Sequence, residues 1–237
     1  MRAAIIVAGG SGERLGLEGG KQLARVSGRP LLSHTLAAFD RCPAIDAIVV
    51  VVHPARLDEY RHEAIEPVGS QKVVAVVAGG DTRQGSVAAG LAAVPAQAEI
   101  VAVHDGARPL VTPEVIGHAI EELEADATLD GVVVGHPSYD TLKIVDESGA
   151  VVGTVDRDLF WAAQTPQVFR VAVLREAYAR AAEDVAPATD DAALVERCGG
   201  SVRMIVGPRR NIKITVAEDL SVAAALLEGR VGEESDG

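Results

Sequence analysis

Two cationic residues follow a glycine-rich segment near the beginning of the chain. In AAIIVAGGSGERLGLEGGKQL (residues 3–23), an apolar run leads into three glycines within four residues, and Arg14 and Lys21 come next. Backbone N–H groups in such a loop can line a concavity for phosphate oxygens, while arginine and lysine supply positive charge. The spacing therefore predicts a site for an anionic ligand, against the alternative of a solvated surface turn.

The loop departs from two well-known phosphate-binding patterns. The dinucleotide pattern G-x-G-x-x-G needs a glycine at position 15, where the chain has Leu15. The P-loop pattern needs serine or threonine after Gly20 and Lys21, where the chain has Gln22. The loop is therefore expected to bind phosphate in another way.

An aspartate and a lysine far along the chain suit the same chemistry. Asp105 in VHDGARP follows an apolar run, and a carboxylate there is a hard oxygen ligand of the kind that Mg²⁺ prefers. Lys213 in NIKIT lies in an apolar, strand-like setting, where a lysine needs an anionic partner. The alternatives are a turn-forming aspartate, a lysine that extends to solvent, and a surface ion pair between Arg108 and Glu114.

These residues fall between elements that alternate along the chain. Short Val/Ile runs predict strands at residues 3–8, 47–52, 72–78, 99–104, 131–135 and 201–206. The remaining segments predict helices at residues 30–40, 56–65, 83–94, 112–126, 169–181, 190–198 and 216–228. Unbroken apolar runs are typical of strands buried on both faces of a parallel sheet. The order predicts an α/β fold with an open, mostly parallel, Rossmann-like twisted sheet flanked by helices, and ligands at the carboxyl ends of its strands.

Residues 136–160 interrupt this alternation. The segment alternates like a strand, turns at residues 146–149 and alternates again, which is typical of a β-hairpin. We therefore expect a β-arm that projects from a single domain spanning residues 1–228. The acidic tail, residues 229–237, is expected to be flexible.

Composition narrows the possible partners. The 237-residue chain carries a formal net charge of −12 and only two cysteines, Cys42 and Cys198. The acidic balance argues against a nucleic-acid-binding surface, which needs a basic footprint. The scarcity of cysteine favours a reducing compartment, and no apolar run is long enough to span a membrane. The expectation is a cytoplasmic protein without nucleic-acid or membrane partners.

Eight short motifs together resemble a known enzyme family. They are AGGSGERLG…GKQL, GGDTRQGS (79–86), VHDGARP (103–109), DTLK (140–143), TVDR (154–157), QTPQ (164–167), TDD (189–191) and NIKIT (211–215). In this order they resemble the 2-C-methyl-D-erythritol 4-phosphate cytidylyltransferases, nucleotidyltransferases of the non-mevalonate isoprenoid pathway. One departure is Gly20, where the family commonly has proline, and this predicts a looser loop ahead of Lys21.

The resemblance implies an activity and a set of site residues. The activity is transfer of CMP from CTP to 2-C-methyl-D-erythritol 4-phosphate, with release of pyrophosphate and with Mg²⁺ as cofactor. The implied catalytic residues are Arg14, Lys21, Lys213 and Arg157. The implied nucleotide-binding residues are Ala8, Gly9, Gly10, Gly12, Gly80, Asp81, Arg83 and Ser86. The implied alditol-phosphate contacts are Asp105, Arg108, Thr141 and Arg157, and Asp105 is also the implied metal ligand.

A lone hairpin is marginal in water, and this one carries apolar residues on both strands, so we expect a two-fold homodimer in which each β-arm packs on its partner; the resemblance adds the contacts of the arm with substrate. Thr141 and Arg157 of one subunit would then reach the substrate phosphate in the other subunit's site. Two other functions stay open at this point: a cytidylyltransferase for ribitol 5-phosphate, and a non-catalytic nucleotide-binding regulator with the same fold.

Overall fold

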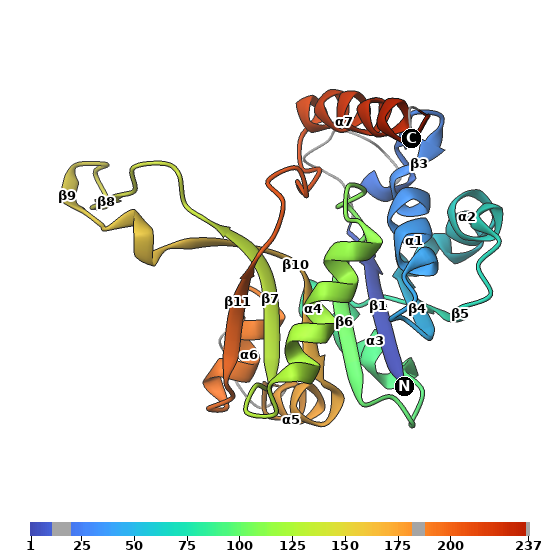
Figure 1. Ribbon diagram of the computed structural model, residues 1–237, viewed down its shortest axis with the longest axis horizontal. Helices are drawn as coiled ribbons and strands as arrows, with labels where there is room; N and C mark the ends of the chain where they lie inside the picture. Colours follow the sequence, from blue (N-terminus) through green and yellow to red (C-terminus); the bar gives the residue numbers. More distant parts are fainter. Residues whose placement is uncertain (11–19, 182–187, 236–237) are drawn as a thin grey trace.

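Seven strands form one sheet at the centre of the protein (Figure 1). The structure is a computed structural model that describes residues 1–10, 20–181 and 188–235. The strand order across the sheet is β11-β7-β10-β6-β1-β4-β5. These strands are β1 (Arg2–Ala8), β4 (Ala47–Val52), β5 (Val73–Ala78), β6 (Ile100–Asp105), β7 (Gly131–Pro137), β10 (Trp161–Arg170) and β11 (Val202–Val206). The six predicted strands are all present, and the predicted α/β class is confirmed.

Helices cover both faces of the sheet because its strands are apolar on both sides. In β1, Ala4 and Ile6 belong to the cluster under α1 (Leu31–Arg41) and α4 (Pro113–Ala125). Ala3 and Ile5 belong to the cluster under the opposite layer, which consists of α3 (Arg83–Ala93), α5 (Val171–Ala181) and α6 (Asp191–Arg197). Successive strand residues point to opposite faces, so one short apolar run serves both clusters.

Strand β10 differs from the sequence-based expectation. No strand is predicted for residues 161–170, yet β10 lies in the sheet antiparallel to both β6 and β7. Its middle is polar and contains Pro166, which lacks the N–H group that a central strand normally donates. The pairing with β7 shifts register between Ala163 and Gln167, so the proline falls within an interruption of the ladder. The helix predicted from residue 169 begins at Val171.

The helix predicted at residues 56–65 is instead a series of short turns. Residues Pro54–Arg56 and Glu66–Val68 form 3-10 turns on either side of α2 (Leu57–Tyr60) and a π-helical turn at Arg61–Ile65. Pro67 lacks the N–H group that a helix continuing past Ile65 would use, whereas Pro54 lies in the first turn, where that group is not needed.

The predicted arm is a β-hairpin that projects away from the sheet (Figure 1). Its strands are β8 (Lys143–Val145) and β9 (Val151–Thr154), and the turn between them is closed by Asp146. The Oδ1 atom of Asp146 accepts hydrogen bonds from the backbone N–H groups of Ser148 and Ala150 at 2.9 and 3.0 Å. Gly149 has a φ angle of 83°, which glycine adopts without a steric penalty.

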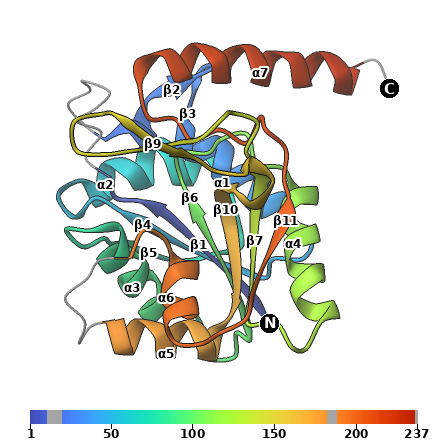
Figure 2. The same cartoon turned by 90° about the vertical axis from the view of Figure 1, so that its left-hand side faces the viewer.

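The last helix, α7 (Ala217–Ser235), lies across the end of the sheet above β2 (Arg25–Val26) and β3 (Arg29–Pro30), as Figure 2 shows. Beneath it, Leu31, Leu110 and Ile214 form a small third apolar cluster with Val26 and Ala223. The helix extends past its predicted end at residue 228, across Gly229 and Gly232, although glycine is a poor helix former. The flexibility expected for residues 229–237 stays a prediction. Among the described residues, no helix has the length and apolarity needed to cross a membrane.

Candidate functional site

The carboxyl ends of the parallel strands surround a cavity of about 480 Å³. Its walls come from the end of β1, the turn Lys21–Leu23, the segment between β5 and α3, the end of β6 and the segment before α7. The cavity therefore gathers many of the residues singled out from the sequence: Gly9, Gly10, Lys21, Gly80, Asp81, Arg83, Ser86, Asp105 and Lys213.

Asp105 is the centre of the charged groups in this cavity. Lys213 Nζ lies 2.9 Å from its Oδ2 atom, Arg83 Nε lies 3.2 Å from Oδ1, and Arg108 Nε lies 3.6 Å from Oδ2. Burial acts to raise the pKa of this carboxyl group, but the three cations outweigh burial and hold the pKa well below its ordinary value. Asp105 is therefore ionised and surrounded by positive charge.

The buried residues Asp191 and Tyr178 hold Arg83 in place. Its Nη2 atom donates to Asp191 Oδ2 at 2.8 Å, and Asp191 is fully buried at the start of α6. The hydroxyl group of Tyr178 donates to the other oxygen of Asp191 at 2.5 Å. Burial and the neighbouring Asp191 raise the pKa of Tyr178, which keeps its hydroxyl protonated as a donor. The first turn of α3 thus presents a guanidinium group whose direction is fixed.

Strand β10 positions the segment that carries Lys213. Asn211 is fully buried, and its Nδ2 atom donates to the Thr165 carbonyl at 2.8 Å and to Gln164 Oε1 at 3.1 Å. The Asn211 carbonyl in turn accepts a hydrogen bond from Arg108 Nη1 at 2.8 Å. The QTPQ and NIKIT motifs, far apart in sequence, therefore fix Arg108 and Lys213 relative to each other.

His104 lies beneath Asp105 as a neutral, fully buried side chain. Its Nδ1 atom is 3.0 Å from Thr165 Oγ1, and its Nε2 atom is 3.3 Å from the Arg108 carbonyl. Thr165 Oγ1 accepts the backbone N–H of Asp105 at 3.1 Å, which leaves its own hydroxyl hydrogen for His104 Nδ1. Burial lowers the pKa of His104 to about 3. The network holds the backbone on both sides of the Asp105 carboxylate.

Gly80, one of the predicted nucleotide-binding glycines, lies with its neighbour Gly79 where space is tight, since a Cβ atom on Gly80 would come within 3.1 Å of the Gly85 backbone. Ser86 Oγ accepts the backbone N–H of Gly80 at 3.2 Å, and a Cβ atom on Gly79 would approach the same oxygen to 2.7 Å. Thr82 rather than Asp81 caps α3, since its Oγ1 accepts the N–H of Gly85 at 2.9 Å. Asp81 is exposed at the cavity wall, where its predicted contact with a base stays a prediction.

Gln22 and Tyr60 are two residues of the site that sequence reasoning did not single out. The Gln22 amide is 3% exposed and, with its nitrogen directed at the glycine loop, donates to the carbonyls of Ala8 and Gly10 at 3.2 and 3.3 Å. The same nitrogen reaches the Tyr60 hydroxyl at 3.1 Å. Tyr60 lies under Gly20, whose φ angle is 84°. A polar residue directly after Lys21 was the available signal.

Lys21 and Lys213 approach the cavity from different parts of the chain. Lys21 begins the short turn after Gly20, and its Nζ atom donates to the Ile214 carbonyl at 3.1 Å. Because Ile214 follows Lys213 directly, the two ammonium-bearing segments adjoin each other. Their predicted catalytic roles stay predictions.

Six predicted site residues do not line this cavity. Ala8 and Arg108 are the sequence neighbours of the lining residues Gly9 and Ala107. Gly12 and Arg14 lie outside the described residues. Thr141 and Arg157 lie on the arm, where Arg157 Nη1 donates to the Tyr139 carbonyl at 3.0 Å and both side chains are exposed.

The side chains available as metal ligands decide how the predicted Mg²⁺ ion could be held. Among the described residues, no group of three or more His, Cys, Asp or Glu side chains could hold a metal ion. Asp105 alone fits a Mg²⁺ ion that takes most of its ligands from substrate phosphates and water. Both of its oxygens face cations, so an arriving metal ion competes with Lys213 and Arg83 for them.

Comparison with known proteins agrees with this geometry. The family model of 2-C-methyl-D-erythritol 4-phosphate cytidylyltransferase matches residues 2–229. The enzyme of that name from Geotalea uraniireducens is 43% identical over 95% of this chain and 96% of its own length. The one from Syntrophotalea carbinolica is 45% identical over 94% of this chain and 95% of its own length.

Solved structures agree as well. The 4-diphosphocytidyl-2C-methyl-D-erythritol synthase of Anaerococcus prevotii superposes with a TM-score of 0.82 at 31% identity, covering 96% of each chain. The 2-C-methyl-D-erythritol 4-phosphate cytidylyltransferase of Thermus thermophilus gives a TM-score of 0.76 at 32% identity, covering 94% of this chain and 98% of its own. Because the family model matches nearly the whole chain and relatives of that name are 43% and 45% identical over it, this chain belongs to the 2-C-methyl-D-erythritol 4-phosphate cytidylyltransferase family.

Proposed function

We propose that the protein transfers CMP from CTP to 2-C-methyl-D-erythritol 4-phosphate and releases pyrophosphate. The observation that carries this proposal is the cationic group around Asp105, next to the glycine loop, in a chain of this family. An oxygen of the alditol phosphate attacks the α-phosphorus of CTP, and the bond from that phosphorus to the bridging oxygen of the β-phosphate breaks. Because the attacking phosphate is already an anion, the reaction needs no general base.

The residues of the cavity supply charge neutralisation and alignment. Negative charge increases on the α-phosphoryl oxygens and on the departing pyrophosphate as the reaction proceeds. Lys21 and Lys213 are placed to stabilise that charge, while Arg83 and Arg108 hold the carboxylate that orients Lys213. Fixed cations of this kind lower the barrier because they need no reorganisation at the moment of reaction.

Mg²⁺ is the proposed cofactor, with Asp105 as its protein ligand. When bound, such an ion draws negative charge from phosphate oxygens and helps to align them. Asp81 also lines the cavity but is exposed, and Asp105 is already paired with cations, so we expect CTP to bring the ion into the site.

The remaining proposals concern the base, the arm and the location. Asp81, Gly80 and Ser86 lie close enough together to recognise a pyrimidine edge.

The exposed apolar side chains of the arm, which include Ile144, Val151 and Leu159, support packing on a second subunit. Two free cysteines support a reducing, cytoplasmic location.

The decisive experiment is a pyrophosphate-release assay with CTP and one alditol phosphate at a time. We expect rapid release with 2-C-methyl-D-erythritol 4-phosphate, slow release with ribitol 5-phosphate, and none without an alditol phosphate. Faster release with ribitol 5-phosphate would support the other cytidylyltransferase activity. Saturable CTP binding without release under any condition would support the non-catalytic regulator.

A further inference from the structure

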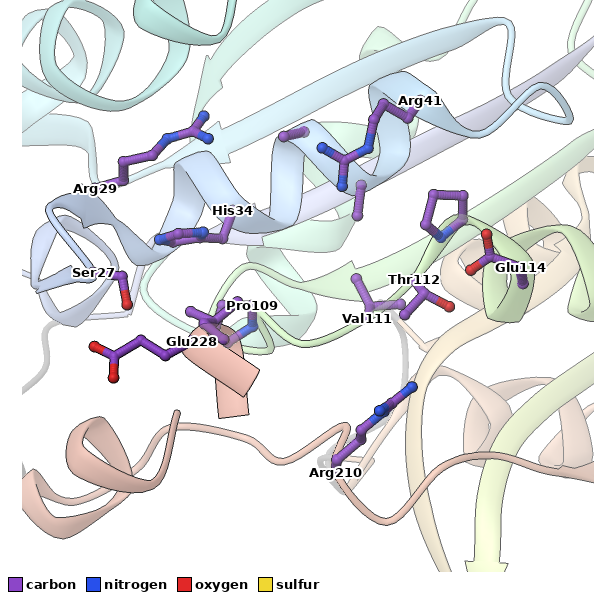
Figure 3. A pocket seen from close by; sticks show the side chains of 14 residues that line it. Ser27, Arg29, His34, Arg41, Pro109, Val111, Thr112, Glu114, Arg210 and Glu228 are labelled. Atoms are coloured by element: carbon purple, nitrogen blue, oxygen red, sulfur yellow. The ribbon is translucent and has the colours of Figure 1, made fainter. Parts of the chain in front are cut away.

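A second, larger cavity lies behind the catalytic loops. It has a volume of about 580 Å³ and lies between α1, the beginning of α4, β3, the segment before α7 and the part of α7 at Leu227 and Glu228 (Figure 3). Its lining includes the apolar residues Ala37, Ala38, Val111 and Leu227 together with polar and charged ones. None of its lining residues takes part in the site proposed for CTP and the alditol phosphate.

Three arginines from separate elements surround this cavity. Arg29 comes from β3, Arg41 is the last residue of α1, and Arg210 belongs to the segment before α7. On α1, the lining positions His34, Ala37, Ala38 and Arg41 share one helix face, since residues three, four and seven apart lie side by side. In Figure 3, the guanidinium groups of Arg41 and Arg210 are directed toward the space between them.

These arginines differ from most other described arginines because their guanidinium groups contact no hydrogen-bond or ion-pair partner. Within the described part of the chain, only four arginine side chains whose surroundings are described make no hydrogen bond, ion pair or cation–π contact: Arg29, Arg41, Arg61 and Arg210. Three of the four line this one cavity. In a chain with a net charge of −12, that concentration of unpaired positive charge indicates a place for an anion.

The acidic residues that line the cavity do not prevent an anion from binding between the arginines. Glu114 and Glu228 also line it, but their carboxylates lie toward opposite ends of the view in Figure 3, away from the space between Arg41 and Arg210. The 13-residue helix α4 begins at the cavity wall and adds the partial positive charge of its N-terminus. The centre of the cavity is therefore the positively charged part.

We propose that this cavity binds an organic phosphate, a phosphate monoester with an apolar body. A tetrahedral dianion can accept hydrogen bonds from two guanidinium groups that approach from different sides, as those of Arg41 and Arg210 do, whereas a planar carboxylate is satisfied by one of them. The apolar lining residues Ala37, Val111 and Leu227 then cover the organic part of the ligand.

The same cavity adjoins the backbone that carries the catalytic cations. Pro109 lines it directly after Arg108, and Arg210 lines it directly before Asn211. Those two segments are joined by hydrogen bonds from Arg108 Nη1 to the Asn211 carbonyl and from the Ile214 N–H to the Ala107 carbonyl, both 2.8 Å long. An anion that draws Arg210 toward Arg41 therefore acts on the segment of Lys213, and occupancy changes turnover. This second step rests on the proposed function, whereas the binding step does not.

Binding is tested by calorimetric titration with n-hexyl phosphate. We expect saturable binding that is weakened at least tenfold in Arg41→Gln/Arg210→Gln, and weakened in high salt because exposed charges are screened. Arg61→Gln is the matched control, since it removes an equally unpaired arginine outside the cavity, and it should leave the affinity within twofold. Inorganic phosphate should bind more weakly than n-hexyl phosphate, and hexanoate more weakly still.

The outcomes separate this cavity from the catalytic one. If Lys213→Ala abolishes binding of n-hexyl phosphate and the double arginine variant does not, the probe occupies the catalytic cavity and the proposal is wrong. Equal affinity in all variants, or no saturable binding, also overturns it. The coupling is tested by adding n-hexyl phosphate at saturating CTP and alditol phosphate. A change in kcat of twofold or more in the wild type, absent in the double arginine variant, supports the coupling, and an unchanged kcat with binding intact refutes it alone.

Discussion

Single residues set the charge of the catalytic cavity before any ligand arrives. Lys21, Arg83, Arg108 and Lys213 contribute four positive charges in and around it, and Asp81, Asp105 and Asp191 contribute three negative ones, which leaves one positive charge among the described residues. Asp105 does not neutralise the positive charge of the site, but it fixes the positions of the cationic side chains. A triphosphate then meets a positive field that is already organised.

Removing Lys213 should slow turnover much more than it weakens the fold. In Lys213→Ala we expect kcat to fall about 100-fold or more, because the lost cation faces charge that increases in the transition state. Steady-state kinetics and thermal melting, measured on the same preparation, check this. Lys213→Arg keeps the charge and should recover part of kcat. A folded Lys213→Ala protein with near-normal kcat would contradict the assignment.

His104 should make stability depend on pH in a defined window. Its pKa is lowered from an ordinary 6.5 to about 3 by burial, so the unfolded chain binds a proton that the folded protein excludes. The free energy of unfolding should therefore be highest above pH 6.5 and fall as the pH decreases toward 3, by at most about 1.4 kcal/mol per pH unit.

The measurement is urea unfolding at several pH values between 6.5 and 5. His104→Gln cannot titrate, so its unfolding free energy should fall less over this range than that of the wild type. The pKa of Asp105 is also lowered, but its unfolded value is near 3.8, so its effect comes below this window. Parallel pH dependences for the two proteins would show that His104 does not titrate as described.

Sequence patterns predict some of the strands and miss one of them. Apolar runs predict β1, β4, β6 and β7 because strands buried on both faces are continuously apolar, and they also predict the edge strands β5 and β11, which are partly exposed. Parallel order then brings Asp105 to the same edge as the glycine loop. Strand β10 leaves no such pattern, because Thr165 and its neighbours serve the site instead of the core. Its hydrogen bonds join positions about 40 to 60 residues apart, a pairing that periodicity does not encode.

The turn before Lys21 shows a second limit. The family commonly has proline at position 20, and its absence predicts a looser loop. Gly20 has a φ angle of 84°, which proline cannot adopt because its ring fixes φ near −65°. In this chain, glycine is therefore required by the conformation of the turn that precedes Lys21, and whether the loop is looser stays a prediction.

Substitutions at Gly20 should separate backbone strain from crowding. Gly20→Ala places a Cβ atom 2.4 Å from the Tyr60 hydroxyl oxygen, so we expect a loss of stability and a raised KM for CTP. Removing that oxygen in Gly20→Ala/Tyr60→Phe should restore part of both, leaving the strain of about 1 kcal/mol that a positive φ costs a non-glycine residue. Gly20→Pro should be worse than either. Denaturant unfolding and CTP titration check the order, and a fully tolerated Gly20→Pro would contradict the conformation of this turn.

At the scale of the whole molecule, the arm projects from the domain with its apolar side chains exposed. A two-stranded hairpin is marginal in water on its own, yet β8 and β9 project from the sheet with Ile144, Val145, Val151 and Val152 more than half exposed. Leu159 at the base of the arm is 79% exposed. An apolar surface of this kind is typical of a segment that packs on another chain. A two-fold dimer would cover it and would bring Arg157 and Thr141 to the partner's cavity.

Subunit mixing tests this dimer together with its shared site. Arg157→Ala and Lys213→Ala homodimers should each be nearly inactive. If Arg157 serves the partner's site and Lys213 its own, every mixed dimer has one site with both substitutions and one site with neither. Random exchange makes about half of the dimers mixed, so roughly a quarter of wild-type activity should return. The activity is read from pyrophosphate release, and native mass spectrometry measures the extent of exchange.

The control pairs two substitutions that the proposal places in the same subunit's site. Lys21→Ala mixed with Lys213→Ala should give mixed dimers in which each site keeps one lesion, so almost no activity should return. Recovery in this control would mean that the active site is divided between subunits in some other way. If exchange is complete and the Arg157→Ala and Lys213→Ala mixture stays inactive, Arg157 serves its own subunit or none, and the arm-shared site is refuted.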